Sequence, residues 1–253
     1  LMGSIGEFAS LTMDERLLLI REARSMSPLP MVANVSATSF SDILRLAREA
    51  DRCGYDAVMV LPPYYYGQTT RQLLHYYRAL GQQLPGKWFA YNFPARTGCD
   101  ITPELVATLA AEFSNFAGIK DTVDCQSHTR NIILAVQDIR PDFAVLSGYD
   151  EYLIPNLLAG GAGIISGLNN IMPERFVQAK QAWAQGDLAT LHQIQKDISR
   201  FSAIYAIGDD FVTTIKTVVS RKFGYCGTTA RNFGGELDDA ACRTVDTLFG
   251  IAR

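Results

Sequence analysis

The amino-acid sequence predicts an α/β protein, a (β/α)8 TIM barrel with a C-terminal helical extension. Three observations lead to this prediction. Strand-like and helix-like segments alternate along residues 1–172, as in a parallel sheet whose strands are joined by right-handed helical crossovers. The strand-like segments are short and almost wholly apolar, as in a sheet that helices cover on its outer face. From residue 173 onward, only helix-like segments remain.

Each element has its own signal in the sequence. The expected strands are short apolar runs bounded by polar or turn residues, at 30–35, 57–61, 87–92, 116–120, 143–147 and 162–166. Helix starts are marked by capping residues: Thr12 has Glu15 three residues later, and Thr102 precedes Pro103. Gly54 is placed to end a helix. The expected helices are 12–25, 41–53, 70–84, 103–112, 127–137, 151–159, 173–185, 188–206, 211–223 and 238–248.

We expect a single structural unit, in which residues 1–172 form an N-terminally incomplete barrel. Residues 173–253 would supply the last barrel helix and the additional C-terminal helices. Residues 1–4 have the character of a strand tail, so the sequence shows six full strands and one tail where such a barrel has eight. Because an open barrel exposes strand edges, we expect the biological protein to have a longer N-terminus, with the first βα unit missing from this sequence.

The composition argues against several classes of function. The chain has 253 residues and a net charge of −3, which is unfavourable for binding nucleic acid or an anionic membrane. No apolar run approaches the roughly 20 residues of a membrane span, and residues 1–20 lack the pattern of a secretory signal. The five cysteines and three histidines show no metal-ligand spacing, so we expect a cytoplasmic protein with reduced thiols and no metal.

Lys120 and Tyr91 are the residues that best indicate chemistry. Lys120 ends an apolar strand, and in α/β barrels the carboxyl ends of the strands carry the reactive groups. Burial favours a neutral amine, which attacks carbonyl carbons, although a lysine at a strand end more often reaches solvent. Tyr91 ends the preceding strand. Since sequential strands are usually neighbours, we expect its phenol to lie beside the amine and to transfer protons.

Three motifs carry a resemblance to a known family. Residues 91–94 read Tyr-Asn-Phe-Pro, residues 118–122 read Gly-Ile-Lys-Asp-Thr, and residues 3–7 read Gly-Ser-Ile-Gly-Glu. In this order and spacing they resemble the dihydrodipicolinate synthase / N-acetylneuraminate lyase family of class I aldolases, over residues 1 to about 167. The resemblance implies that Lys120 forms a Schiff base with a 2-keto acid such as pyruvate, that Tyr91 transfers protons, and that no cofactor is needed.

The resemblance also assigns binding roles near both ends of the predicted site. Ser4 and Ile5 stand in the turn that binds the pyruvate carboxylate in the family, where glycines let backbone N–H groups converge near a helix N-terminus. Ile5 departs from the family because it lacks the usual hydroxyl. By itself the segment is also compatible with an ordinary turn. The resemblance further places the Ile165 backbone carbonyl near the imine and Gly148 beside the substrate.

Two further residues carry alternatives. Tyr65 lies in the run of three tyrosines 64–66 and aligns with a family tyrosine that reaches across a dimer interface, which implies a homo-oligomer, a tetramer built from tight dimers. The same run is compatible with ordinary packing aromatics. Arg96 matches an arginine that faces a second carboxylate in dihydrodipicolinate synthases, where a guanidinium can bind in a bidentate fork. It is equally compatible with a solvated surface arginine.

The leading functional prediction is a Schiff-base aldolase or lyase that cleaves or forms a 2-keto-3-deoxy sugar acid, with pyruvate and an aldehyde as the other partners. The run from Tyr91 through Asp150 most resembles bacterial enzymes of that kind. The first alternative is a dihydrodipicolinate synthase, which condenses pyruvate with aspartate semialdehyde; Arg96 favours it and Ile5 disfavours it. The second is a pyruvate-binding barrel without activity, against which the presence of Lys120 and Tyr91 speaks.

Overall fold

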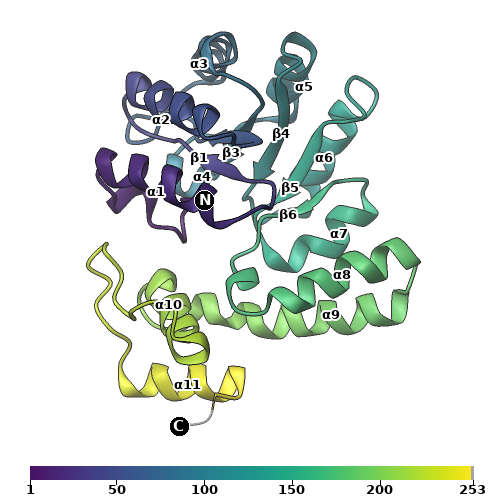
Figure 1. Cartoon of the computed structure of the whole chain (residues 1–253). Helices are drawn as coiled ribbons and strands as arrows, with labels where there is room; N and C mark the ends of the chain where they lie inside the picture. The colour runs from purple at the N-terminus through teal and green to yellow at the C-terminus, as the bar shows by residue number, and fades with distance from the viewer. Residues whose placement is uncertain (252–253) are drawn as a thin grey trace. The chain divides into compact units, whose positions relative to one another are not determined.

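The computed structural model describes residues 1–251 and divides into two compact units, Leu1–Ile165 and the segment from Ser166 onward. Figure 1 traces the chain from the first unit, drawn in purple to teal, to the second, drawn in green to yellow. The first unit contains a parallel sheet and its helices, and the second contains helices alone. The prediction that the two stretches form a single structural unit stays a prediction.

The first unit is built on one curled sheet of six parallel strands, which pair in the order in which they occur along the chain. The strands are β1 (Val32–Asn34), β2 (Ala57–Val60), β3 (Trp88–Asn92), β4 (Phe116–Asp121), β5 (Ala144–Ser147) and β6 (Gly163–Ile164). Leu1 extends the sheet beside β1, because its carbonyl accepts a hydrogen bond from the Asn34 amide at 3.0 Å. Sequential parallel pairing brings the carboxyl ends of all strands to one rim.

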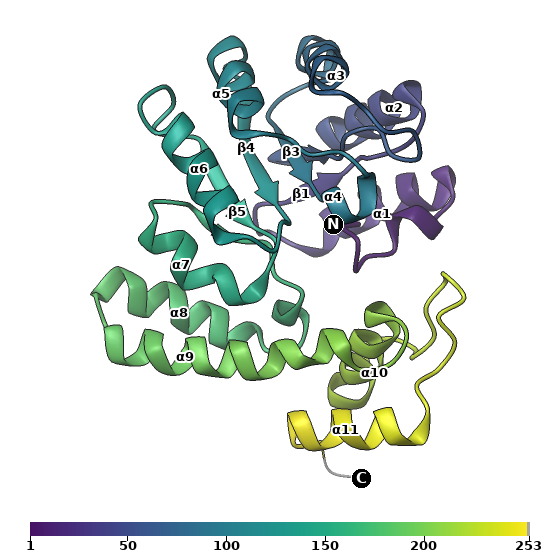
Figure 2. The same ribbon diagram turned by 180° about the vertical axis from the view of Figure 1, so that it is seen from behind.

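Helices lie around the outer face of this sheet, as seen from both sides in Figures 1 and 2. They are α1 (Met13–Met26), α2 (Phe40–Arg52), α3 (Thr70–Gln83), α5 (Pro103–Glu112), α6 (Gln126–Val136) and α7 (Leu153–Leu158). The capping box of Thr12 and Glu15 is present at the start of α1, and Thr102 caps α5. Gly54 has a φ of +78° directly after α2, a conformation that glycine adopts without the strain of a side chain.

All six predicted strands are present, each within about two residues of its expected position. Residues 1–251 contain this curled six-stranded sheet and no closed barrel of eight strands. The helix expected over 151–159 begins instead as a 3-10 turn, η2 (Asp150–Tyr152), and continues as α7. Three short elements were not predicted, the 3-10 turns η1 (Phe8–Ser10) and η3 (Leu168–Asn170) and the single turn α4 (Pro94–Thr97). They are too short to produce a periodic pattern in the sequence.

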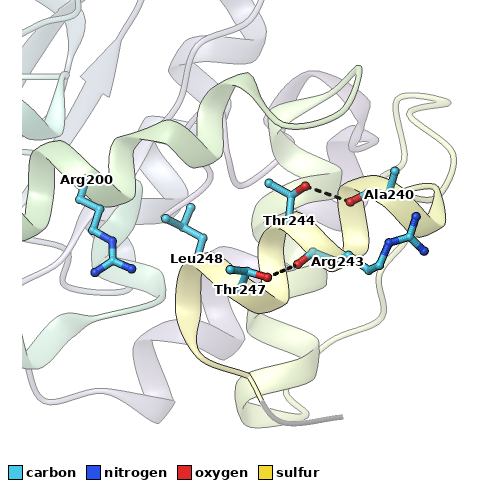
Figure 3. Close-up of a pocket in the computed structure, with 6 residues that line it drawn as sticks. All are labelled: Arg200, Ala240, Arg243, Thr244, Thr247 and Leu248. Atoms are coloured by element: carbon cyan, nitrogen blue, oxygen red, sulfur yellow. Dashed lines mark hydrogen bonds between the residues drawn. The ribbon is translucent and has the colours of Figure 1, made fainter.

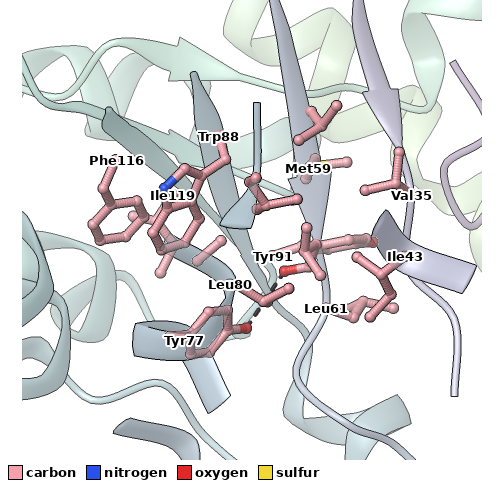
Figure 4. Packing of buried hydrophobic residues seen from close by; sticks show 14 of the residues in the cluster. Val35, Ile43, Met59, Leu61, Tyr77, Leu80, Trp88, Tyr91, Phe116 and Ile119 are labelled. Carbon is pink, nitrogen blue, oxygen red and sulfur yellow. Dashed lines mark hydrogen bonds between the residues drawn. The ribbon is translucent and has the colours of Figure 1, made fainter. Parts of the chain in front are cut away.

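An aromatic stack in the core fixes the middle strands of the first unit (Figure 4). Trp88 begins β3 and stacks on Phe116, which begins β4, with ring centroids 4.1 Å apart. Tyr77 of α3 also stacks on Trp88, with ring centroids 5.9 Å apart. All three side chains are fully buried. Because these rings anchor the beginnings of β3 and β4, the two strands run side by side to their carboxyl ends, where Tyr91 and Lys120 lie.

The second unit consists of four α-helices and two 3-10 turns within the described residues. The helices are α8 (Pro173–Gln185), α9 (Leu188–Phe201), α10 (Phe211–Phe223) and α11 (Asp239–Phe249), and the turns are η3 (Leu168–Asn170) and η4 (Ser202–Ala206). Aspartates cap three of these helices, at positions 187, 210 and 238. Among residues 1–251, none of the helices combines the length and hydrophobicity needed to cross a bilayer.

Candidate active site

A chain of three side chains links the ends of β3 and β4 to the turn after Leu1. Lys120 Nζ donates a hydrogen bond to the Tyr91 hydroxyl oxygen at 3.1 Å. The same oxygen lies 3.0 Å from Ser4 Oγ, with either hydroxyl able to donate. Lys120 is only 7 % exposed and Tyr91 only 1 %. An amine, a phenol and a serine hydroxyl in sequence can therefore pass protons in a site that is largely closed to water.

The register of the sheet explains why these groups meet. Tyr91 pairs with Lys120, and the next residues, Asn92 and Asp121, also pair. Successive side chains of a strand point to opposite faces, so Tyr91 and Lys120 share the inner face and Asn92 and Asp121 the outer one. Gly118 permits close approach on both sides of β4, because a Cβ there would lie 2.3 Å from the Ala144 carbonyl oxygen of β5 and 2.4 Å from the Phe89 ring of β3. The prediction that Lys120 and Tyr91 are neighbours at one rim is confirmed.

The turn that carries Ser4 differs from its expected form in one respect. It leads into the three-residue 3-10 turn η1, whereas the first α-helix begins only at Met13, after the Thr12 cap. The helix that adjoins the turn is therefore a single 3-10 turn and not an α-helix. Glu7 adopts a left-handed conformation with φ +56° and its amide bonds back to the Ser4 carbonyl at 3.1 Å. This closes the turn and directs Ser4 towards Tyr91.

The remaining predicted site residues lie in different surroundings. Gly148 packs directly against the Thr122 side chain, and a Cβ at this position would lie 2.0 Å from Thr122 Oγ1. Ile165 is half-buried after β6, with its amide bonded to the Ser147 carbonyl at 2.9 Å. Arg96 is exposed on α4. Tyr65 is 87 % exposed and is not part of the hydrogen-bond chain of Lys120, Tyr91 and Ser4.

Tyr65 has a second unusual property, a φ of +87°. A positive φ strains a bulky side chain. Its ring meets that of Tyr66 edge to face, with centroids 5.0 Å apart, and Tyr66 is also exposed. Two large aromatic rings held at the surface in a strained loop are typical of a contact surface rather than of a solvated one.

Thr122 is a further candidate for the site, to which the sequence analysis gave no role. It lies two positions after Lys120, so strand alternation directs it to the same face. Its side chain is buried, and within the described residues its hydroxyl has no hydrogen-bond partner. A buried hydroxyl without a partner is unfavourable by about 1–3 kcal/mol. Its position in the Gly-Ile-Lys-Asp-Thr motif was the available signal, and its free hydroxyl is suited to a polar group of a ligand.

His128 and Asp100 were also missed. His128 lies in the first turn of α6, with Nδ1 3.0 Å from Asp121 Oδ2 and Nε2 3.2 Å from Asp100 Oδ2. The hydrogen bonds to Asp100 and then to Asp121 raise the pKa of His128 to about 10. Burial would raise the pKa of the Asp100 carboxyl, but hydrogen bonds from His128 and Asn92 outweigh it and leave the pKa below its usual value. Asp100, Asp121 and His128 follow no spacing in the sequence that would have predicted their contact.

A separate pocket lies in the second unit, between α9 and α11 (Figure 3). It is lined by Arg200, Ala240, Arg243, Thr244, Thr247 and Leu248. The two threonine hydroxyls donate to carbonyls of their own helix, four residues earlier, at 2.9 Å each. Because these hydroxyls are already paired, the pocket offers less convergent polar chemistry than the rim around Lys120, which we take as the candidate active site.

The family model for the dihydrodipicolinate synthetase family matches residues 1–245. The chain therefore belongs to this family, and it is an enzyme of the lyase class. The probable 2-dehydro-3-deoxy-D-pentonate aldolase YjhH of Escherichia coli strain K12 is 37 % identical over 217 residues, which are 85 % of this chain and 72 % of that protein. A 4-hydroxy-tetrahydrodipicolinate synthase of Kosmotoga olearia is 32 % identical over 195 residues, which are 76 % of this chain and 66 % of that protein.

Solved structures agree with this placement. The crystal structure of YagE from Escherichia coli K12, in complex with pyruvate, has a TM-score of 0.94 and 32 % identity. The match covers 99 % of this chain and 86 % of that one. YagE carries the name putative 2-dehydro-3-deoxy-D-gluconate aldolase. The α/β fold of the chain is thus that of its family.

Proposed function

We propose that the protein is a Schiff-base aldolase that cleaves or forms a 2-keto-3-deoxy sugar acid, with pyruvate and an aldehyde as the smaller partners. The observation that carries the proposal is the buried contact of 3.1 Å between Lys120 Nζ and the Tyr91 hydroxyl. The similarity to YjhH and YagE, both named as aldolases of 2-dehydro-3-deoxy acids, supports the substrate class. We also propose that the six-stranded sheet is part of an eight-stranded barrel.

Each residue of the hydrogen-bond chain has a step in the proposed reaction. The Lys120 amine attacks the keto carbon of the substrate, water leaves, and the resulting imine accepts electrons. Tyr91 takes the proton from the substrate hydroxyl, and the carbon–carbon bond breaks to give an aldehyde and an enamine. Reprotonation and hydrolysis release pyruvate and restore Lys120. Ser4, 3.0 Å from the Tyr91 oxygen, relays the proton, and the turn around Ile5 binds the carboxylate.

Thr122 would contact the sugar-acid chain beyond the imine. Thr122→Val removes the hydroxyl and keeps the shape, so we expect kcat/KM for a polyhydroxylated acid to fall about 3- to 10-fold, the value of one neutral hydrogen bond. The rate of imine formation with pyruvate alone should stay within about twofold. Thr108→Val, an exposed threonine on α5, is the matched control. Equal effects of Thr122→Val on both substrates would remove Thr122 from the specificity site.

Arg96 favours the alternative function, that of a dihydrodipicolinate synthase. Its exposed position on α4, the turn that follows Tyr91 and Phe93, is compatible with a guanidinium that receives a second carboxylate at the mouth of the site. The similarity to named 4-hydroxy-tetrahydrodipicolinate synthases also favours it. This reading predicts that aspartate semialdehyde serves as the aldehyde.

An assay with a panel of substrates distinguishes the sugar-acid aldolase from the dihydrodipicolinate synthase. The purified protein is incubated with 2-keto-3-deoxy pentonates and hexonates of each configuration, and pyruvate release is measured. In parallel, pyruvate is offered with aspartate semialdehyde and with glyceraldehyde or glycolaldehyde. We expect pyruvate release from at least one sugar acid, with higher kcat/KM than any condensation with aspartate semialdehyde. The reverse order would replace the leading function by the alternative.

We also propose that Tyr65 completes the proton relay of a neighbouring copy in a homo-oligomer, a tetramer of two tight dimers. Its exposure of 87 % and its strained φ of +87° support a role at an interface. Sedimentation of the wild type and of Tyr65→Ala, with activity measured on the same samples, tests this. A fully active monomer would contradict both the assembly and the role of Tyr65.

A further inference from the structure

Four side chains form a closed hydrogen-bonded ring on the outer face of β3 and β4. Asn92 Nδ2 donates to Asp100 Oδ1 at 2.8 Å and to Asp121 Oδ1 at 2.9 Å. His128 closes the ring by bonding the second oxygen of each aspartate, at 3.2 Å to Asp100 and 3.0 Å to Asp121. Thr129 adds a further donor to Asp121 Oδ2 at 2.6 Å. The ring joins β3, β4, the segment before α5 and the first turn of α6.

The geometry of the ring requires a protonated histidine. A neutral imidazole has one N–H and one lone pair, whereas both nitrogens of an imidazolium donate. Each ring nitrogen of His128 faces a carboxylate oxygen, so a neutral ring would direct its lone pair at an anion. The raised pKa of His128 agrees with this. The Asp121 side chain is fully buried and that of His128 is 16 % exposed, and a buried carboxylate needs such a charged partner.

The position of the ring ties it to the reactive residues. Asn92 follows Tyr91 directly, Asp121 follows Lys120 directly, and the two pairs are in register across the strands. The backbone continues the same connection, because the Thr122 amide donates to the Asn92 carbonyl at 2.8 Å. The ring therefore holds the last residues of β3 and β4 together on the outer face of the sheet, while Lys120 and Tyr91 meet on the inner face.

We propose that His128, as an imidazolium bridging Asp100 and Asp121, is a positioning residue that sets the contact between Lys120 and Tyr91. It does not touch the reacting atoms, since strand alternation places the ring on the opposite face from the amine and the phenol. The inference rests on the proposed function, because it assumes that Lys120 and Tyr91 perform the chemistry. A displacement of about 1 Å in such a site can cost about 10²-fold in rate.

A metal site does not explain the cluster. Within residues 1–251, no group of three or more histidine, cysteine, aspartate or glutamate side chains is arranged to hold a metal ion. Both nitrogens of His128 already face carboxylates, which leaves no lone pair directed at a common centre. A fixed bridge between the end of β4 and the segment before α5 accounts for both contacts of His128.

The test compares His128→Phe with the wild type. Phenylalanine fills similar space without donors, and His75→Phe, at an exposed histidine on α3, is the matched control. We expect turnover and the rate of borohydride trapping with pyruvate to fall about 10- to 100-fold, with KM within about threefold. His75→Phe should behave as the wild type. All rates are referred to the folded fraction of each sample, measured by thermal unfolding.

A double variant separates positioning from a general structural role. If His128 acts through the Tyr91 contact, His128→Phe should lower turnover much less in a Tyr91→Phe background than in the wild type, because coupled residues are not additive. Additive losses would overturn the inference, as would a folded His128→Phe variant with turnover and trapping within twofold of the wild type. Should that variant not fold, Asp100→Asn decides, since the Asp100 side chain is 42 % exposed; an unchanged rate would then overturn it.

The dependence on pH gives an independent readout. The groups that face His128 are Asp100 and Asp121, with Glu104 at the start of α5 and Cys125 before α6 also interacting electrostatically. Since the pKa of His128 is raised from 6.5 to about 10, its stabilisation is fully present below about pH 6.5 and is lost as the pH rises through about 10. The stability difference between wild type and His128→Phe should shrink over this range; a constant difference would contradict a protonated bridge.

Different outcomes would contradict the proposed function and the positioning role of His128. If wild-type protein gives no pyruvate adduct on Lys120, the proposed function fails and the positioning role fails with it. If the wild type gives the adduct and His128→Phe gives it equally fast, only the positioning role is lost.

Discussion

Replacing Lys120 by alanine should lower turnover by at least about 10⁴-fold, since the loss of a covalent nucleophile can lower turnover by about 10⁶-fold in other enzymes. The amine is the only group of the hydrogen-bond chain that can form an imine, and it is 7 % exposed beside Tyr91. Steady-state pyruvate release from the best sugar acid of the panel is the measurement. The fold should persist, because alanine is smaller and the aromatic stack at the beginnings of β3 and β4 is untouched.

Two controls make this result specific. Lys120→Arg places a positive charge beside Tyr91 but cannot form the same imine, so it should be as inactive as Lys120→Ala. Lys87→Ala removes an exposed lysine that directly precedes β3, away from the carboxyl rim, and should keep full activity. Substantial turnover by Lys120→Arg would show that the lysine contributes only charge, and covalent catalysis would have to be abandoned.

Tyr91→Phe should lower turnover about 10²- to 10⁴-fold, the usual contribution of general acid–base catalysis. The phenol oxygen lies between Lys120 Nζ at 3.1 Å and Ser4 Oγ at 3.0 Å, so its removal breaks the proton path and leaves the amine in place. Borohydride trapping of pyruvate should therefore fall much less than turnover. The comparison of these two rates on one preparation is the measurement.

Tyr77→Phe is the matched control for the phenol. Tyr77 is also fully buried, and its hydroxyl donates to the Val60 carbonyl at 3.4 Å, so the substitution removes a buried hydroxyl outside the site. It should leave turnover within a fewfold of the wild type. If Tyr91→Phe retained wild-type turnover, Tyr91 would be a packing residue and another group would have to move the proton.

Much of the fold was predictable from local signals. The short apolar runs correctly located all six strands, and capping residues such as Thr12 and Thr102 marked helix starts that the structure confirms. The neighbouring positions of Tyr91 and Lys120 followed from sequential pairing of parallel strands. These features depend on residues close together in the sequence or on general rules of α/β topology.

The parts that were missed depend on contacts between distant residues. The Thr122 hydroxyl is buried without a partner, and Gly148, which follows the next strand, packs against it. The pKa of His128 is raised because Asp100 and Asp121 converge on its two nitrogens. The helix beside the Ser4 turn is the three-residue η1 and not an α-helix, and so short a turn leaves no periodic signal. Such features require side-chain geometry, which hydrophobic patterning does not contain.

The central claim is that Lys120 forms an imine with pyruvate. The most direct measurement is incubation of the purified protein with pyruvate and borohydride, followed by peptide mapping by mass spectrometry. We predict a single reduced adduct on Lys120, absent from Lys120→Arg and retained in Tyr91→Phe. An adduct on any other lysine, or no adduct on a folded protein, would contradict the account.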